Sequence, residues 1–155
     1  MGDPVKVLLA DDEKSIRVLL RMALKDTPDV SIVAEASNGV EAVRLAQDLR
    51  PDVILLDLNM PEMDGIRATV QIRRVHPAGR VIVLTAYEDH ILRRDAFRCG
   101  AWCYLVKGES SLADLVAILR TAGGEAENPE TPYGWANYWR RWLSVEERAP
   151  EVRCA

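Results

Sequence analysis

Short apolar runs alternate with longer amphipathic segments along the first 124 residues of the chain. The runs are too short for helices, contain β-branched residues and are bounded by turn residues, which together favour strands. Near-continuous apolar character indicates strands that are buried on both faces of a sheet. We predict five strands, at Val5–Ala10, Ser31–Ala36, Val53–Asp57, Val81–Ala86 and Trp102–Val106.

The segments between these runs place apolar residues at the spacing of an α-helix. Asn38 and Asp64 stand where side chains cap helix N-termini, and Ser111 with Asp114 has the spacing of a capping box. Pro and Gly follow several of the segments and mark helix ends. We predict helices at Lys14–Lys25, Val40–Leu49, Ile66–Val75, His90–Cys99 and Leu112–Ala122.

Strict alternation of strands and helices predicts an α/β fold with a parallel sheet covered on both faces and right-handed crossovers. In such a sheet every strand points its carboxyl end at the same edge, where ligands bind. The residues at or just beyond the carboxyl ends of the predicted strands should therefore meet there. They are Asp11, Asp12, Asp57, Thr85 and Lys107.

This set of residues has the composition of a phosphoryl-transfer site. Three carboxylates repel one another unless a cation joins them, and an open site of oxygen ligands suits Mg²⁺. Asp57 can act as a nucleophile toward phosphorus, while Lys107 and Thr85 can hold phosphoryl oxygens. Taken singly, each residue has an ordinary structural explanation, such as acids at a helix N-terminus. Taken together at one edge, they favour the functional interpretation.

Several motifs resemble those of the receiver domains of bacterial two-component response regulators. The resemblance runs over Val5–Ala122 and is carried by Asp11-Asp12, by LLDLNMPEMDG around Asp57, by Thr85-Ala86 and by YLVK at Tyr104–Lys107. It implies a flavodoxin-like, doubly wound, five-stranded parallel sheet with strand order 2-1-3-4-5. The segment ASNGVEAVRLAQDLRPDVILLD further resembles receivers of regulators with a helix-turn-helix output.

The resemblance also implies roles for individual residues. Asp57 would accept a phosphoryl group from a phosphohistidine on a sensor kinase. Thr85 would both bind the phosphoryl group and, with Tyr104, report the switched state. The remaining implied ligands are Lys107 for the phosphoryl group, and Asp12, Asp57, the backbone carbonyl of Asn59 and, through water, Asp11 for Mg²⁺.

One residue departs from the common receiver pattern, and two others stand at positions that tune the phosphoryl site of receivers. Gly108 stands after Lys107, where many receivers have a proline, and its backbone freedom would allow the turn. Asn59 and Tyr87 lie two residues beyond Asp57 and Thr85. The resemblance implies that these two positions control the access of water to the phosphoryl group.

The resemblance to receivers ends near residue 124, and the next residues are acidic and contain two prolines. We therefore predict a receiver domain at 1–124, an acidic Pro-containing linker at 125–132 and a helical tail at 133–149. The tail places aromatic and apolar residues on one helical stripe. We expect the tail to pack on the fourth-helix, fifth-strand, fifth-helix face, in its own chain or across a homodimer. A partner's groove and a membrane surface are the alternatives, the latter ranked last. The stripe consists of Trp135, Tyr138, Trp139, Trp142 and Leu143.

Composition limits the remaining choices. The net charge of −4 argues against direct nucleic-acid binding, and the residues after Gly124 are too few for a helix-turn-helix domain, which needs roughly 60. No apolar stretch is long enough to span a membrane and no export signal is visible, so we expect a cytoplasmic location. Cys99, Cys103 and Cys154 show no metal-binding spacing, which predicts reduced thiols.

The sequence therefore predicts a phosphorylation-activated switch rather than an enzyme that turns over substrate. One alternative is that the chain is the receiver part of a DNA-binding regulator whose output domain is missing. A second is an aspartate-dependent phosphatase. That class places a second Asp two residues beyond its nucleophile, and the corresponding residue here is Asn59.

Truncation after Gly124 tests the packing of the tail. Burying each large apolar side chain contributes roughly 1.5–3 kcal/mol, so we expect the truncated chain to unfold at a lower temperature than the intact chain. Intrinsic fluorescence, thermal denaturation and sedimentation of the two chains measure packing, stability and association. Red-shifted tryptophan emission in the intact chain, with no stability lost on truncation, would contradict the prediction.

Overall fold

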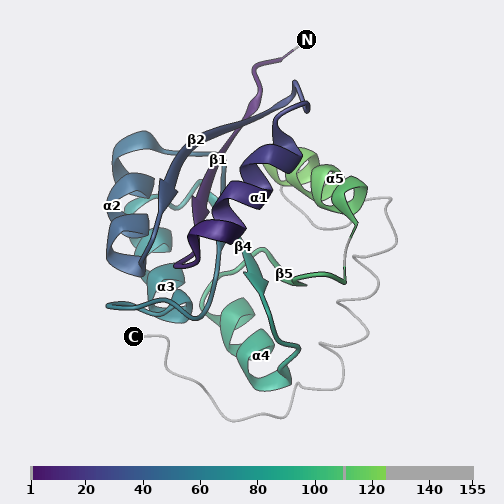
Figure 1. Cartoon of the computed structure of the whole chain (residues 1–155). Helices are drawn as coiled ribbons and strands as arrows, with labels where there is room; N and C mark the ends of the chain where they lie inside the picture. Colours follow the sequence, from purple (N-terminus) through teal and green to yellow (C-terminus); the bar gives the residue numbers. More distant parts are fainter. Residues whose placement is uncertain (1, 110, 125–155) are drawn as a thin grey trace.

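The computed structural model describes residues 2–109 and 111–124 and has one five-stranded parallel sheet (Figure 1). The strand order is β2-β1-β3-β4-β5, which confirms the predicted flavodoxin-like topology. The apolar runs lie in this sheet because burying both faces removes their side chains from water. The strands are β1 (Val5–Ala10), β2 (Val30–Ala36), β3 (Val53–Leu56), β4 (Arg80–Thr85) and β5 (Cys103–Val106).

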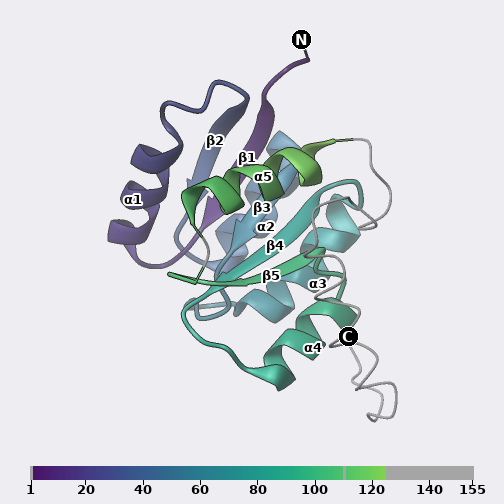
Figure 2. The ribbon, with the colours of Figure 1, turned by 90° about the vertical axis from the view of Figure 1, so that its right-hand side faces the viewer.

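Five helices cover the two faces of the sheet, as Figures 1 and 2 show. Alternate residues of the central strands divide the core into two clusters, since successive strand side chains point to opposite faces. Helices α1 and α5 pack on one cluster, whereas α2, α3 and α4 pack on the other. The helices are α1 (Lys14–Leu24), α2 (Gly39–Leu49), α3 (Gly65–Val75), α4 (His90–Arg98) and α5 (Leu112–Gly123).

The predicted helix caps are present. The Asn38 side chain accepts a hydrogen bond from the Glu41 amide (2.8 Å), and Asp64 accepts one from the Arg67 amide (2.9 Å). Ser111 and Asp114 exchange both bonds of a capping box, each 3.1 Å long. These bonds satisfy amides that the first helical turn leaves without partners, so they define where α2, α3 and α5 begin.

Several element ends differ from the predictions by one residue. The strand predicted to include Asp57 ends at Leu56, although the Asp57 amide still donates to the Ala10 carbonyl (2.9 Å). The fifth strand begins at Cys103 rather than Trp102, after a turn in which Gly100 has a φ of +103°. Glycine adopts that conformation at low steric cost, which explains the abrupt end of α4.

The cysteine prediction is wrong at one position. Cys103 is a buried free thiol, as expected, but Cys99 is disulfide-bonded. Pairing depends on proximity in three dimensions, which spacing along the chain does not reveal. The predicted linker (125–132) and tail (133–149) lie outside the described residues.

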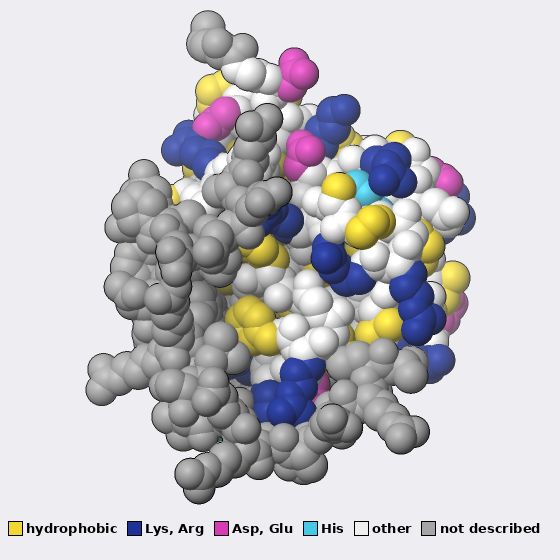
Figure 3. Space-filling view, turned by 180° about the vertical axis from the view of Figure 1, so that it is seen from behind, with side chains coloured by type: hydrophobic (Ala, Val, Ile, Leu, Met, Phe, Trp, Pro, Cys, Tyr) yellow, Lys and Arg dark blue, Asp and Glu magenta, His cyan; other side chains and the backbone are white. Residues whose placement is uncertain are grey.

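Charge is distributed unevenly over the molecule. Figure 3 shows the face opposite to that of Figure 1, where Lys and Arg side chains are more frequent than acidic ones. Arg73 and Arg74 lie in the last turn of α3, where cations interact favourably with the helix dipole. Within the described part of the chain, no helix combines the length and apolar character needed to cross a bilayer.

Gly65 is where the loop after β3 turns into α3, and we predict that Gly65→Ala destabilises the fold. A Cβ atom at this position would lie 2.4 Å from the Asp57 carbonyl oxygen and 2.6 Å from Leu58 Cα, both backbone atoms. We expect a loss of roughly 1–3 kcal/mol in urea denaturation, which outweighs the better helix propensity of alanine. Gly2→Ala, with no atom within 4 Å of the new Cβ, is the control. Equal stability of the two variants would refute the prediction.

Candidate functional site

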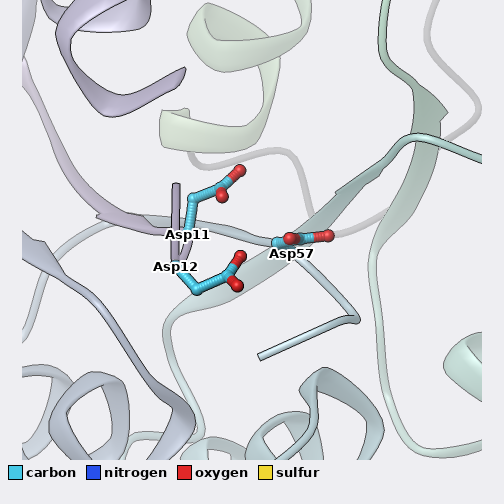
Figure 4. Close-up of side chains that lie close together, drawn as sticks. All are labelled: Asp11, Asp12 and Asp57. Carbon is cyan, nitrogen blue, oxygen red and sulfur yellow. The ribbon is translucent and has the colours of Figure 1, made fainter. Parts of the chain in front are cut away.

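Three carboxylates converge at the carboxyl edge of the sheet, as the sequence predicts. Asp11 and Asp12 directly follow β1, and Asp57 directly follows β3, the strand that pairs with β1. One carboxylate oxygen from each of the three lies within 4.8 Å of the others, and Figure 4 shows the side chains gathered around a common space. Parallel pairing of β1 with β3 therefore builds the acidic site.

Asp11 is held in place by two hydrogen bonds to its carboxylate. It is buried, and accepts from the Glu13 amide (2.9 Å) and from Lys107 Nζ (2.6 Å). Asp12 is exposed, so its carboxylate faces an ion arriving from solvent. Asp12 is therefore the member of the pair that solvent can reach, whereas the Asp11 carboxylate is already bonded to protein groups.

Lys107 supplies the only side-chain cation within 4 Å of these three carboxylate groups in the described part of the chain. Its Nζ atom lies 2.6 Å from an Asp11 oxygen and 3.7 Å from an Asp57 oxygen. The side chain is correctly placed because Lys107 follows β5 and its amide donates to the Thr85 carbonyl at the end of β4 (2.7 Å). A point charge beside Asp57 can attract an anionic group bound there.

Thr85 ends β4 and is completely buried. Its hydroxyl makes no hydrogen bond within the described ranges. A buried hydroxyl without a partner loses the hydrogen bonds it had to water, and this costs free energy. Thr85 is thus prepared to donate to an acceptor that arrives at the sheet edge.

Burial raises the pKa of Asp57 to about 6, because an ionised carboxylate is poorly solvated there. This value already includes the effects of Lys107 and the Asn59 amide, which lower the pKa, and of the Asp11 and Asp12 carboxylates, which raise it. Asp57 is still mostly ionised at neutral pH, as a nucleophile must be.

The acidic cluster fits a divalent metal ion. All its side-chain ligands are oxygens, which Mg²⁺ prefers, and oxygens on opposite sides of a bound Mg²⁺ lie about 4 Å apart. The like charges that raise the pKa of Asp57 are those that a cation would neutralise. The cluster therefore gathers the ligand type and the negative charge that Mg²⁺ requires at one place.

The remaining predicted residues lie outside the acidic cluster. Asn59 is exposed and its amide donates to Asp57 Oδ1 (3.4 Å). Tyr87 is 63% exposed, whereas Tyr104 is only 1% exposed. Gly108 has a φ of +83°, which a proline cannot adopt, so the loop after Lys107 does use glycine's backbone freedom.

Sequence reasoning missed Arg93, on α4. It is 7% exposed, and its guanidinium lies over the Tyr104 ring at 4.8 Å from the centroid. An arginine in a short helix normally indicates a solvated face, so no signal in the sequence distinguished this one.

A family model for the response regulator receiver domain matches residues 7–120. The chain belongs to this family. It is 43% identical over 118 residues to the transcriptional regulatory protein LiaR of Bacillus subtilis, a match that covers 76% of this chain and 56% of the relative. It is 37% identical over 149 residues to the response regulator protein VraR of Staphylococcus aureus, covering 95% and 71%. The chain spans about half the length of the Bacillus subtilis relatives it matches.

Solved receivers share the fold. The receiver domain of the putative response regulator NarL from Mycobacterium tuberculosis has a TM-score of 0.74 at 32% identity, covering 80% of this chain and all of that one. The response regulator domain of Thermotoga maritima CheB has a TM-score of 0.71 at 31% identity, covering 77% and 96%. The chain is thus a receiver domain of the kind found in two-component response regulators.

The raised pKa of Asp57 predicts how pH affects stability. The folded state binds the Asp57 proton more tightly than the unfolded state does. This difference stabilises the folded state fully below about pH 4, and the stabilisation is lost as pH rises through about 6. In EDTA, we therefore expect Asp57→Asn to raise the thermal midpoint at about pH 8, with the gain shrinking toward about pH 5. Asp48→Asn, at an exposed position of α2, should show no such trend. A gain that does not depend on pH would contradict the burial argument.

Proposed function

We propose that Asp57 is the phosphoacceptor of this receiver and takes its phosphoryl group from a phosphohistidine of a sensor histidine kinase. The observation that carries the proposal is the position of Asp57 between two carboxylates and Lys107 at the carboxyl edge of the sheet. The same edge carries the buried Thr85 hydroxyl. Membership of the receiver family supports this assignment.

The transfer uses the ionised form of Asp57. A carboxylate oxygen forms a bond to phosphorus while the bond from phosphorus to the donor's imidazole nitrogen breaks, and the electron pair stays on that nitrogen. The product is an acyl phosphate on Asp57. Lys107 would pair with one phosphoryl oxygen and the Thr85 hydroxyl would donate to another, so negative charge developing on these oxygens is stabilised.

We further propose that Asp12, Asp57 and the backbone carbonyl of Asn59 hold Mg²⁺, with Asp11 supporting through water. Mg²⁺ supplies positive charge that offsets the repulsion between the carboxylates and the incoming phosphoryl group. Asp11 suits the supporting role because its carboxylate is already bonded to Lys107 and the Glu13 amide.

Thr85 and Tyr104 would transmit the change. Movement of the Thr85 hydroxyl toward a phosphoryl group alters the end of β4, and Tyr104 lies on β5, the strand that pairs with β4. A ligand shifts a conformational equilibrium only through contacts that differ between the states, and this hydrogen bond is such a contact.

The domain is in this proposal a switch that does not turn over an external substrate. Residues 1–124 form the receiver. It would signal through the face formed by α4, β5 and α5, and this face together with the tail would form the interface of a homodimer. A role as the receiver part of a DNA-binding regulator is the second candidate, since LiaR is described as a transcriptional regulatory protein and the match covers 56% of it. Asn59 in place of an acid disfavours a phosphatase.

Incubation with acetyl phosphate and Mg²⁺ tests the acceptor. We expect the intact mass to show one phosphoryl group, absent in Asp57→Asn and present in Asp48→Asn. Lys107→Met should slow the reaction on the order of 10²-fold, because it removes a charge from the phosphoryl site. An adduct that persists in Asp57→Asn, or that forms equally well in EDTA, would refute the assignment.

A further inference from the structure

The Tyr104 ring is held from two directions. Its hydroxyl donates to the Tyr87 carbonyl oxygen (3.1 Å), and the Arg93 guanidinium covers one face of the ring at 4.8 Å from its centroid. Burial raises the pKa of Tyr104 to about 12, so the hydroxyl keeps its proton and remains a donor. The ring is therefore held in a buried position. We take this position to be the one favoured when the Thr85 hydroxyl moves toward Asp57, because the ring can then fill the space that Thr85 releases.

Arg93 is itself unusual because it is a buried cation. Its Nη2 atom pairs with Glu88 Oε2 at 2.6 Å, and the side chains are 8% and 36% exposed. A charged group is seldom buried without a partner, and a desolvated guanidinium is attracted to the negative face of an aromatic ring. Glu88 and the Tyr104 ring together offset the loss of water around Arg93.

These contacts join three elements at one place. Tyr87 and Glu88 lie in the loop that follows Thr85, Arg93 lies on α4, and Tyr104 lies on β5. Any movement of Thr85 toward Asp57 starts two residues before the carbonyl that accepts from Tyr104. The loop, the helix and the strand are thus connected to the candidate phosphoryl site.

We infer that Arg93, held by Glu88, is a positioning residue that shifts the Tyr104 ring toward its buried position before Asp57 is phosphorylated. The inference rests on the proposed function for its effect on the site. With the ring already buried, a phosphoryl group needs only to recruit the Thr85 hydroxyl. The clamp formed by Arg93, Glu88 and Tyr104 therefore increases the fraction of molecules that are ready to bind a phosphoryl group, and the apparent affinity rises with that fraction.

The first test uses the full chain with beryllofluoride and Mg²⁺ as the probe. We expect Arg93→Met to weaken beryllofluoride binding roughly three- to tenfold in calorimetry, the range that loss of a partly desolvated cation–ring contact implies. Glu88→Gln should act in the same direction with a smaller effect, and it serves if Arg93→Met does not fold. Arg94→Met is the matched control, because its ion pair is with Asp95 on the same helix.

A double-variant comparison separates positioning from support of the fold. In a Tyr104→Leu background there is no ring to hold, so we expect Arg93→Met to leave beryllofluoride affinity unchanged. A merely structural Arg93 would lower the thermal midpoint in both backgrounds while leaving affinity untouched. That pattern would overturn the inference.

A second readout does not depend on the phosphoryl site. In photochemically induced nuclear polarisation, a tyrosine ring gives a signal only where solvent can reach it. We expect the Tyr104 signal to appear in Arg93→Met but not in Arg94→Met. A ring that stays unlabelled in Arg93→Met overturns the clamp. If the wild-type chain binds no beryllofluoride, the proposed function fails, and this measurement still decides the clamp.

Discussion

The charge around Asp57 must be balanced, and this requirement ties the site to the assembled sheet. Three carboxylates share a space within 4.8 Å at a largely buried edge, where repulsion between like charges is poorly screened. Lys107 reduces this repulsion by approaching Asp11 at 2.6 Å and Asp57 at 3.7 Å. Lys107 follows β5, which lies two strands away from β3 in the sheet. The charges are therefore balanced only when all the strands from β1 to β5 are paired.

The core supplies the free energy that keeps these charges together. β3 and most of β1 are buried on both faces, and the helices seal the two apolar clusters against them. This rigid support holds Asp57 where burial raises its pKa to about 6. A carboxylate whose ionised form is poorly solvated responds strongly to whatever changes its charge, whether a bound cation or a covalent modification. The stable core of the sheet therefore allows the domain to tolerate the charge repulsion at the site.

The site is connected to the surface by short steps. Thr85 joins the sheet edge to the loop before α4, and that loop contacts Tyr104 through the Tyr87 carbonyl and Arg93 through Glu88. Each step is a hydrogen bond, an ion pair or a ring contact that has a discrete broken and formed state. Such contacts, unlike the densely packed core, can change without unfolding the domain.

Local patterns along the chain were enough to predict the helices and strands and the edge of the sheet at which the chemistry lies. Strand and helix periodicities are local, side-chain caps such as Asn38 and Asp64 act within one helical turn, and parallel strands bring their carboxyl ends together. Asp11, Asp12, Asp57, Thr85 and Lys107 could therefore be assigned to one edge from their positions after apolar runs.

The pairing of side chains, in contrast, could be established from the folded chain alone. Lys107 pairs with Asp11, which lies 96 positions earlier in the chain. The Arg93 guanidinium lies over the Tyr104 ring and is not solvated. Cys99 is disulfide-bonded, which the sequence did not predict. The burial of Tyr104 and the pKa of Asp57 are equally products of the assembled environment. Periodicity records which face of an element is apolar, but distance, desolvation and pairing arise when elements far apart in the chain pack together.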